Sequence, residues 1–296
     1  MGVRSFSATL LLAFLLPNTP GQPLRLQHFT PRTLEPAGKE MKLYPSYWGF
    51  QPVAFSGDRM VMRTRSQIQV IDTATLRVLA TYEFRPKATC AVDLDGTTVV
   101  VLYGCSTAKS THFVIWRIDP GSRRVIPVHG LSPVSYPVSG AVGDGQWFLA
   151  RGNGAVDSIN LHTGRTVHHR GPERSLAKAG VPFTQATWLG DHRLGLNGTI
   201  VDVRTWKRRV LAAHAVTLRA AEGWVFGYGT NGITVYDGNL RLYRRIAAGR
   251  VVDNAMIHGG VLYAQIGLVW QLYDVRTGAH IDDVLPDTAW LLRLLS

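Results

Sequence analysis

The chain has 296 residues, of which 46% are hydrophobic, and a formal net charge of +12. This composition supplies a large apolar core, and the excess of positive charge is compatible with an acidic partner; the alternative is that the many arginines reflect genome composition. Beyond the first residues, no segment is long and apolar enough to cross a membrane, which excludes a protein with transmembrane helices. Length alone would suggest about two domains, but the repeats described below indicate one.

The N-terminus resembles a secretory signal peptide in its pattern. Arg4 precedes an apolar run from Ala8 to Leu16, and the segment Pro17–Gly21 contains small and turn-forming residues. A positive start, a short apolar run and a small-residue segment are typical of exported proteins. We therefore predict removal of residues 1–21, a single domain over residues 22–296 and an extracytoplasmic location. The alternative is a partly buried N-terminal strand.

The segment Gln67–Phe84 gives the clearest local pattern. Polar and apolar residues alternate on either side of the turn segment Asp72–Thr75, which predicts two strands joined by a tight turn. With the segments before it, this pair completes a unit of four strands. We expect these strands at Gln51–Phe55, Arg59–Arg63, Gln67–Ile71 and Arg77–Phe84.

The unit recurs along the chain and is marked by one polar residue between its third and fourth strands. The copies are spaced 35 to 47 residues apart, at Asp72, Asp119, Asn160, Asp202, Asp237 and Asp274. A period near forty with four short strands is typical of a β-propeller blade. Further units are expected at Thr89–Val128, Val138–His169, Thr184–Leu211, Val216–Ile246 and Val251–Val284.

Three Asn-Gly pairs support this register independently. They fall between the expected second and third strands, at Asn153-Gly154, Asn197-Gly198 and Asn231-Gly232. Asn-Gly is the strongest short hairpin signal, because both residues adopt positive φ readily.

Two segments of the first unit resemble known propeller repeats. PVAFSGDRMV, which begins at Pro52, resembles the opening of a WD-type blade, and VIDTATLRVLATY, which begins at Val70, resembles the YVTN-type repeat. The YVTN resemblance implies an extracytoplasmic or surface protein and carries no catalytic residues onto this chain.

The segment Thr288–Leu295 follows a complete sixth unit and has the length of one strand. A propeller has to close its ring or leave sheet edges exposed. We predict that this segment joins strands from residues 24–43 in a composite seventh blade. The fold class is therefore an all-β propeller with six clear repeats and one closing blade; a six-bladed ring with loose ends is the alternative.

Cys90 and Cys105 flank the predicted hairpin turn at Asp95-Gly96. Ideal pairing about this turn would place Cys90 opposite Val101, leaving Cys105 about 13 Å further along the strand. That separation disfavours a disulfide, although Gly104 could let the loop curl back.

No catalytic or metal-binding motif is evident in the sequence. The repeated aspartates are expected to accept amide hydrogens in their turns, and His168 and His169 should point to opposite faces of a strand. The glycine-rich segments GAVGDG and RGNGAV fit hairpin turns, and the tryptophans fit packing between blades. HExxH, GxSxG and Walker phosphate-loop motifs are absent. We therefore predict no catalytic residues, no metal and no cofactor.

Two basic groups remain as candidate binding sites. The first should face the narrow mouth of the ring, and its predicted ligand-binding residues are Arg63, Arg65, Arg85, Lys87, Tyr136, Arg151, Arg174 and Lys178. The second lies on outer strands of the fourth and fifth blades and comprises Arg204, Lys207, Arg208, Arg209, Arg241, Arg244 and Arg245. Either group could attract a polyanion, and a solvated surface is the alternative.

Together these patterns favour an extracytoplasmic binding or scaffolding module that acts as a monomer. Its expected partner is a protein, an acidic small molecule or a polyanion; no motif supports nucleic acid. The rival hypothesis is a propeller enzyme, similar to lactonases or quinone-dependent dehydrogenases, with its site at the narrow mouth. Fold alone does not separate these two classes.

Overall fold

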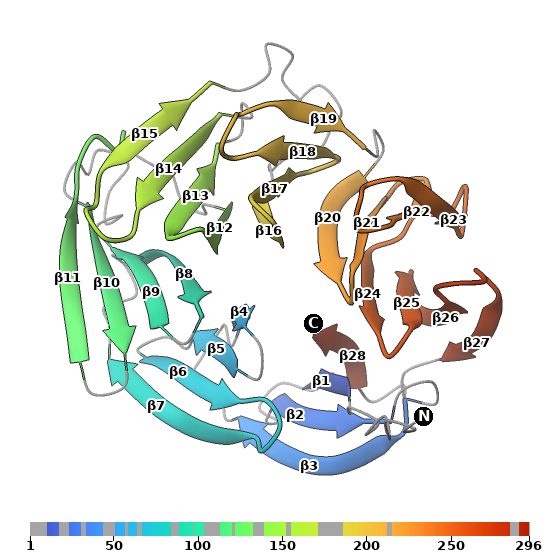
Figure 1. Ribbon diagram of the computed structural model, residues 1–296. Coiled ribbons are helices and arrows are strands. Elements are labelled where there is room, and N and C mark those ends of the chain that lie inside the picture. The colour runs from blue at the N-terminus through green and yellow to red at the C-terminus, as the bar shows by residue number, and fades with distance from the viewer. Residues whose placement is uncertain are drawn as a thin grey trace, which may run out of the picture. The chain divides into compact units, whose positions relative to one another are not determined.

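The computed structural model describes most of the chain as β-structure. The described residues are 11–17, 24–30, 34–43, 51–56, 59–63, 67–83, 89–96, 98–103, 113–119, 122–132, 139–151, 155–170, 186–211, 215–284 and 290–295. They contain no helix and form 28 strands in seven four-stranded antiparallel sheets (Figure 1). Within this described part, therefore, no helix has the length and apolar character needed to span a membrane.

The chain divides into two compact units, of which residues 46–218 form one. Four sheets of this unit follow one another in sequence, and each pairs neighbouring strands in chain order. The first sheet comprises β4 (Gln51–Ser56), β5 (Arg59–Arg63), β6 (Gln67–Asp72) and β7 (Arg77–Glu83). The second comprises β8 (Thr89–Asp95), β9 (Thr98–Tyr103), β10 (Phe113–Asp119) and β11 (Ser122–Val128).

The third and fourth sheets have the same organisation. The third comprises β12 (Ser139–Gly143), β13 (Gln146–Ala150), β14 (Val156–Asn160) and β15 (Thr166–His169). The fourth comprises β16 (Ala186–Gly190), β17 (Arg193–Leu196), β18 (Thr199–Asp202) and β19 (Arg208–Val210).

Apolar faces of consecutive sheets pack against each other in this unit. The first strands β4, β8, β12 and β16 contact one another in that order, and a separate cluster of buried side chains fills each space between neighbouring sheets. Strand alternation explains this packing, because successive side chains point to opposite faces and both faces of an inner sheet are covered. Trp147 and Phe148 show the pattern: they are adjacent on β13, and each is fully buried in a different cluster.

The other unit comprises residues 1–45 and 219–296. One of its sheets consists of β20 (Ala215–Ala221, which runs across the unit boundary), β21 (Trp224–Gly229), β22 (Gly232–Tyr236) and β23 (Leu242–Ile246). The next consists of β24 (Asn254–His258), β25 (Val261–Ile266), β26 (Val269–Asp274) and β27 (His280–Val284). The closing sheet has the order β28 (Trp290–Leu295), β1 (Leu11–Pro17), β2 (Leu24–Phe29) and β3 (Pro36–Leu43).

The closing sheet confirms that both ends of the chain share one sheet, with one correction. The C-terminal strand β28 pairs with β1, and β1 in turn pairs with β2. The direct partner of β28 is therefore the apolar run that the sequence assigns to a signal peptide, and not a strand from residues 24–43. Removal of residues 1–21 stays a prediction.

The predicted limits of the other five repeats, and the four strand ranges predicted within the first, agree with the structure to within about three residues. The turn assignment is also confirmed for five of the six marker residues: side chains of Asp72, Asn160, Asp202, Asp237 and Asp274 accept backbone amide hydrogens. Bonds from the hydroxyl and amide of Thr75 hold the pKa of Asp72 below its ordinary value. The side chain of Asp119 lies outside the described part.

The predicted pairing of Cys90 with Val101 is wrong. Asp95 pairs with Thr98, so Val101 lies opposite Val92, and the register shifts between Thr89 and Ala91. The hairpin therefore turns one residue later than predicted, which moves each partner by two positions, and Cys90 is the extra residue at a separate register shift. Cys105 lies outside the described residues.

Candidate functional site

The predicted mouth residues fall mostly outside the part of the chain that the structure describes. This applies to Arg65, Arg85, Lys87, Tyr136, Arg174 and Lys178. Arg63 ends β5, and its side chain is likewise not described. Arg151 is described in full, so the predicted ligand-binding set stays a prediction apart from the environment of this one residue.

Arg151 follows β13 and is held by a buried carboxylate. Its Nε donates to Oδ2 of Asp157 at 2.6 Å, and Asp157 is only 2% exposed. Nδ1 of His168 lies 2.7 Å from the other oxygen of Asp157. Arg151 therefore balances a buried charge inside the third sheet, in addition to any role in binding.

His168 and His169 point to opposite faces of β15, as predicted from strand alternation. While His168 contacts Asp157, Nε2 of His169 lies 3.0 Å from Oγ of Ser158, and the ring of His169 stacks on Trp206 at 3.3 Å. Burial is the main cause that lowers the pKa of His169. Ser158 is 3% exposed, so its hydroxyl does not meet a substrate in this conformation.

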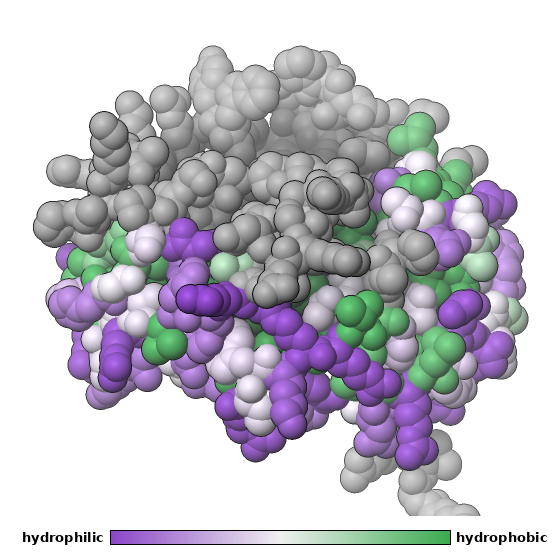
Figure 2. Space-filling view, turned by 90° about the horizontal axis from the view of Figure 1, so that it is seen from above, coloured by the Kyte–Doolittle hydropathy of each residue, from purple (hydrophilic) through white to green (hydrophobic). Residues whose placement is uncertain are grey.

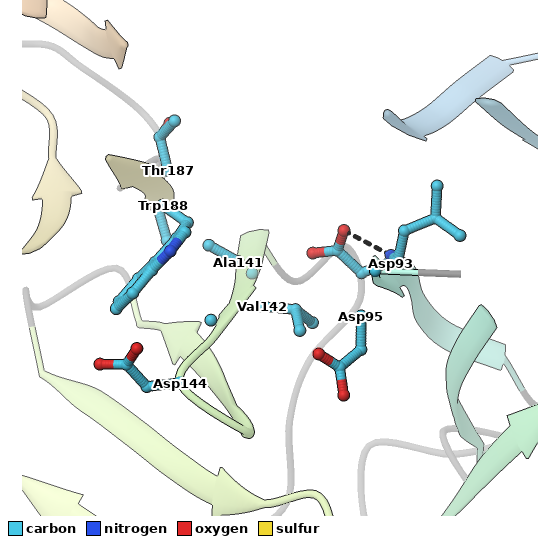
Figure 3. A pocket seen from close by; sticks show the side chains of 12 residues that line it. Asp93, Asp95, Ala141, Val142, Asp144, Thr187 and Trp188 are labelled. Atoms are coloured by element: carbon cyan, nitrogen blue, oxygen red, sulfur yellow. Dashed lines mark hydrogen bonds between the residues drawn. The ribbon is translucent and has the colours of Figure 1, made fainter. Parts of the chain in front are cut away.

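A pocket of about 520 Å³ lies against the first strands of three consecutive sheets in the unit formed by residues 46–218 (Figure 3). Its walls come from the end of β8, from β12 and the turn after it, and from the start of β16. The lining residues are Asp93, Leu94, Asp95, Gly96, Gly140, Ala141, Val142, Gly143, Asp144, Ala186, Thr187 and Trp188.

Strand alternation explains why carboxyl groups line this pocket. Val92 and Leu94 belong to the apolar cluster between the first and second sheets. Asp93 and Asp95 therefore point to the other face of β8, toward the third sheet. The two acids share that face because they are two residues apart.

Two glycines of β12, Gly140 and Gly143, leave space that indole rings occupy beside the pocket. A Cβ at Gly140 would lie 2.7 Å from Nε1 of Trp147, and a Cβ at Gly143 would overlap the indole of Trp188. Trp188 also stacks on Phe148, with ring centroids 5.6 Å apart and nearly parallel planes. The indole is thus held flat against the third sheet while it forms one wall of the pocket.

Two of the three carboxylates have a partner of opposite charge or a histidine. Oδ2 of Asp95 lies 3.3 Å from Nη2 of Arg117, and Nη1 of the same guanidinium donates to the carbonyl of Leu161. Asp144 is hydrogen-bonded to Nδ1 of His192, from the turn between β16 and β17. The bonds from Arg117 to Leu161 and from His192 to Asp144 join neighbouring sheets, and Arg117 offsets the charge of Asp95.

Asp93 differs, because no described cation pairs with it. Oδ1 of Asp93 accepts the amide hydrogen of Leu94 at 2.8 Å, and the amide of Val142 also bonds to the carboxyl group. Burial raises the pKa of Asp93 from 3.8 to about 7, against these two amide bonds, and the nearby charge of Asp95 adds to the rise. In Figure 3 this carboxyl group and Trp188 lie on opposite sides of the view.

The arrangement suits a ligand that brings a positive charge or a hydrogen-bond donor to Asp93. Desolvation makes the isolated carboxylate unfavourable, and a cation placed beside it would offset that cost. Among the described residues, no three His, Cys, Asp or Glu side chains lie close enough to hold a metal ion together. An amine or a guanidinium group would supply both the positive charge and the hydrogen-bond donors that Asp93 could accept.

Sequence reasoning missed this pocket because its acids are next to turn residues. The segments DLDG and GAVGDG, at residues 93–96 and 140–145, were interpreted as hairpin turns only. The available signal was the spacing of Asp93 and Asp95 on one face of an inner strand. Their meeting with Trp188, nearly a hundred residues later, depends on the packing of three sheets.

Comparison with known proteins identifies the fold. No family model matches the sequence, and no curated protein matches it. The computationally designed Ika8 protein superimposes with a TM-score of 0.52 at 13% identity, over 83% of this chain and 90% of Ika8. BamB from Moraxella catarrhalis gives a TM-score of 0.52 at 13% identity, over 93% of this chain and 88% of BamB. Together with the four-stranded sheets, these similarities define the chain as an all-β propeller; the YVTN and WD likenesses stay resemblances.

Proposed function

We propose that this propeller is an extracytoplasmic binding or scaffolding module, which holds a cationic group of a protein partner in the pocket around Asp93. The observation that carries the proposal is the placement of a carboxyl group without a described cationic partner in a 520 Å³ pocket. A propeller that provides a rigid frame for such a pocket is suited to binding, because little ordering is required when the partner arrives.

Size and surroundings favour one long basic side chain as the bound group. The pocket can hold the side chain of lysine or arginine, whose aliphatic part would contact Val142 and Trp188. An aromatic wall also attracts a cation that lies near its face. An anion would meet three carboxyl groups here, so the anionic ligand expected from the sequence would have to bind elsewhere.

The extracytoplasmic part of the proposal depends on Arg4 and the apolar run that follows it. Fractionation of the native host tests it: the protein should be recovered outside the cytoplasm. Recovery with cytoplasmic markers alone would contradict this location without affecting the pocket.

Calorimetric titration with two matched peptides tests the pocket. One peptide carries a single lysine between neutral residues, and the other has glutamine in its place. We expect the lysine peptide to bind more tightly, and its affinity to rise with pH through about 7 as Asp93 ionises. Asp93→Asn should abolish the preference for lysine.

Asp191→Asn is the matched control, because Asp191 is highly exposed, pairs with Arg193 and does not line the pocket. This variant should retain the preference. If Asp93→Asn also retains it, the pocket does not recognise a cation through this carboxyl group.

A second candidate function is an enzyme of the lactonase-like or quinone-dependent type. It is favoured by one observation, namely that a pKa of about 7 lets Asp93 exchange a proton near neutral pH, as a general acid or base requires. A panel of lactones and alcohols should then reveal a turnover that Asp93→Asn reduces at least about a hundredfold. Turnover that is absent, or equal in the variant, would exclude this role for Asp93.

A further inference from the structure

Outer strands of the second, third and fourth sheets follow one another end to end along the edge of the unit formed by residues 46–218. The residue after β11, His129, donates its amide hydrogen to the carbonyl of Gly164 and accepts one from Thr166, at 2.9 and 3.0 Å. These bonds join the end of β11 to the start of β15. Both strands are edge strands of their own sheets.

The same relationship recurs between the third and fourth sheets. Nη2 of Arg208, the first residue of β19, donates to the carbonyl of Arg170 at 2.7 Å. The ring of His169 stacks on Trp206, which precedes β19. The end of β15 therefore meets the start of β19, and Figure 1 shows β11, β15 and β19 in succession on the outer side of their sheets.

This succession of outer strands carries exposed cations along its whole length. We call it the basic belt and define it by Arg123, Arg124, Arg165, Arg170, Arg204, Lys207 and Arg209, all of which are exposed. The stretches that form the belt, residues 122–132, 155–170 and 202–211, contain only two acids. Asp157 is buried against Arg151, and the carboxylate of Asp202 accepts the amides of its own turn.

The other unit offers an informative contrast. Its outer strand β23 carries Arg241, Arg244 and Arg245 at or beside it, and Tyr243 Oη donates to the carbonyl of Arg276 before β27. Strand β27 then presents Asp282 and Asp283, both exposed. Among the five described outer strands β11, β15, β19, β23 and β27, β27 thus presents exposed acids, whereas the three belt strands β11, β15 and β19 contain none.

We propose that the basic belt binds a linear anionic polysaccharide along its length. Arginine predominates in the belt, and its planar guanidinium matches sulfate and carboxylate groups with two parallel hydrogen bonds. A row of cations binds a charged polymer more strongly than a single anion, because each neutralised charge releases a counterion.

Exposed apolar residues favour a polysaccharide over a polymer that is charged at every position. Each belt strand exposes one valine among the cations: Val125, Val167 and Val210 are 48%, 46% and 64% exposed. Sugar rings present C–H surfaces between their charged groups, which these side chains can contact. Figure 2 shows such mixing of hydrophilic and apolar residues over the described surface in that view.

Nucleic acid is less suitable, because the described aromatic rings in the belt and on the neighbouring strand β10 are already stacked. His169 covers Trp206, and Trp116 is stacked on Tyr103 at 4.6 Å with the guanidinium of Arg123 4.9 Å from its centroid. Single-stranded nucleic acid gains much of its affinity from bases that stack on accessible rings.

Binding of a heparin oligosaccharide to the full chain, measured as salt is raised, tests the proposal. The belt variant combines Arg170→Ala, Lys207→Ala and Arg209→Ala, and the control combines Arg241→Ala, Arg245→Ala and Arg276→Ala in the other unit. Both remove three exposed charges. We expect the belt variant to bind heparin at least about tenfold more weakly than the native chain. The slope of log affinity against log salt concentration should be smaller by about two to three, because three charges are lost. The affinity of the control variant should stay within about twofold of the native value.

Three results would overturn the proposal. They are an absence of heparin binding near physiological salt, an equal loss in the control variant, and binding of polyphosphate, polyglutamate or single-stranded DNA that is as tight and as dependent on the belt. The melting temperatures of both variants should match that of the native chain, because all six replaced side chains are exposed. If the belt variant melts at a lower temperature, the single substitution Arg209→Ala should still weaken heparin binding.

Discussion

Trp188 lies flat against Gly143, and a Cβ on this glycine would occupy the position of its indole ring. The two residues belong to neighbouring sheets, so this contact sets how closely β12 and β16 approach at the pocket. The absence of a side chain at Gly143 is thus a packing requirement and not a requirement for an unusual φ.

Gly143→Ala should therefore destabilise the protein and displace the indole. Forcing a methyl group into a packed interior costs typically about 1–3 kcal/mol. Urea unfolding measures the loss, and a shift of tryptophan fluorescence in the folded variant reports the displacement. Gly238→Ala is the control, because a Cβ there meets only an ordinary contact of 3.6 Å with the carbonyl of Gly223. Equal stability of the two variants would show that Trp188 moves freely.

Asp93 should make the stability of the protein fall as pH rises. Burial raises its folded pKa from 3.8 to about 7, so between these pH values the folded chain binds a proton that the unfolded chain releases. This stabilisation is fully present below about pH 4, decreases as pH rises from about 4 to 7, and is lost above pH 7. Asp93→Asn removes the titration, and above pH 8 the variant should be more stable than the native chain by on the order of 1–4 kcal/mol.

Urea unfolding of both proteins at pH 5 and pH 8 gives the comparison. The stability difference between variant and native chain should increase from pH 5 to pH 8 in favour of the variant. A constant difference would mean that Asp93 ionises near its ordinary pKa and that burial does not control it.

Asp157 should be essential for the third sheet. Its carboxylate is buried and contacts both Arg151 and His168, so Asp157→Ala would leave Arg151 beside a buried space without its counter-charge. Loss of one member of a buried ion pair typically costs about 3–5 kcal/mol; exposure of Arg151 and His168 reduces this to roughly 2–4 kcal/mol. Thermal unfolding checks this value, and Glu83→Ala, which removes an exposed carboxylate at the end of β7, should change stability by less than about 0.5 kcal/mol.

The fold was predictable from sequence because its signals are local. Residues such as Asp72 and Asp274 form turns with neighbours two or three positions away, and Asn197 adopts the positive φ that a tight hairpin requires. These contacts recur with the repeat and need no knowledge of distant residues. The error at Cys90 arose at the turn, because Asp95 is the last paired residue of β8 and not a turn residue, which moves each predicted partner by two positions.

The candidate site was not predictable, because it depends on distant contacts. Arg117 reaches Asp95 from another strand, and His192 reaches Asp144 from another sheet, so two of three acids are matched by residues far away in sequence. Only after these partners are known does Asp93 differ from its neighbours. Likewise, the two cations Arg170 and Arg208 form part of one edge because β15 ends where β19 begins.

The last prediction concerns the apolar run Leu11–Pro17, for which sequence and structure give different roles. The sequence assigns it to a segment removed on export, whereas in the structure it forms β1 and pairs with β28 on one side and with β2 on the other. A chain that begins at Gln22 lacks β1, so it would expose unpaired backbone groups of both neighbouring strands. We therefore expect this chain, and equally one that ends at Pro286, to melt at least about 5 °C below the full chain.

Intact mass of the protein from its native host complements these measurements. A mass that includes residues 1–21, together with a lower melting temperature of the shortened chain, would assign the run to the closing sheet of the mature protein. A mass that corresponds to a chain beginning near Gln22, together with an unchanged melting temperature of the shortened chain, would support export with removal of the leader. The closing sheet would then have to form from β28, β2 and β3. Pairing of β1 with β28 and β2 stabilises the mature protein only if β1 is retained. The mass and the melting temperature therefore have to lead to the same assignment.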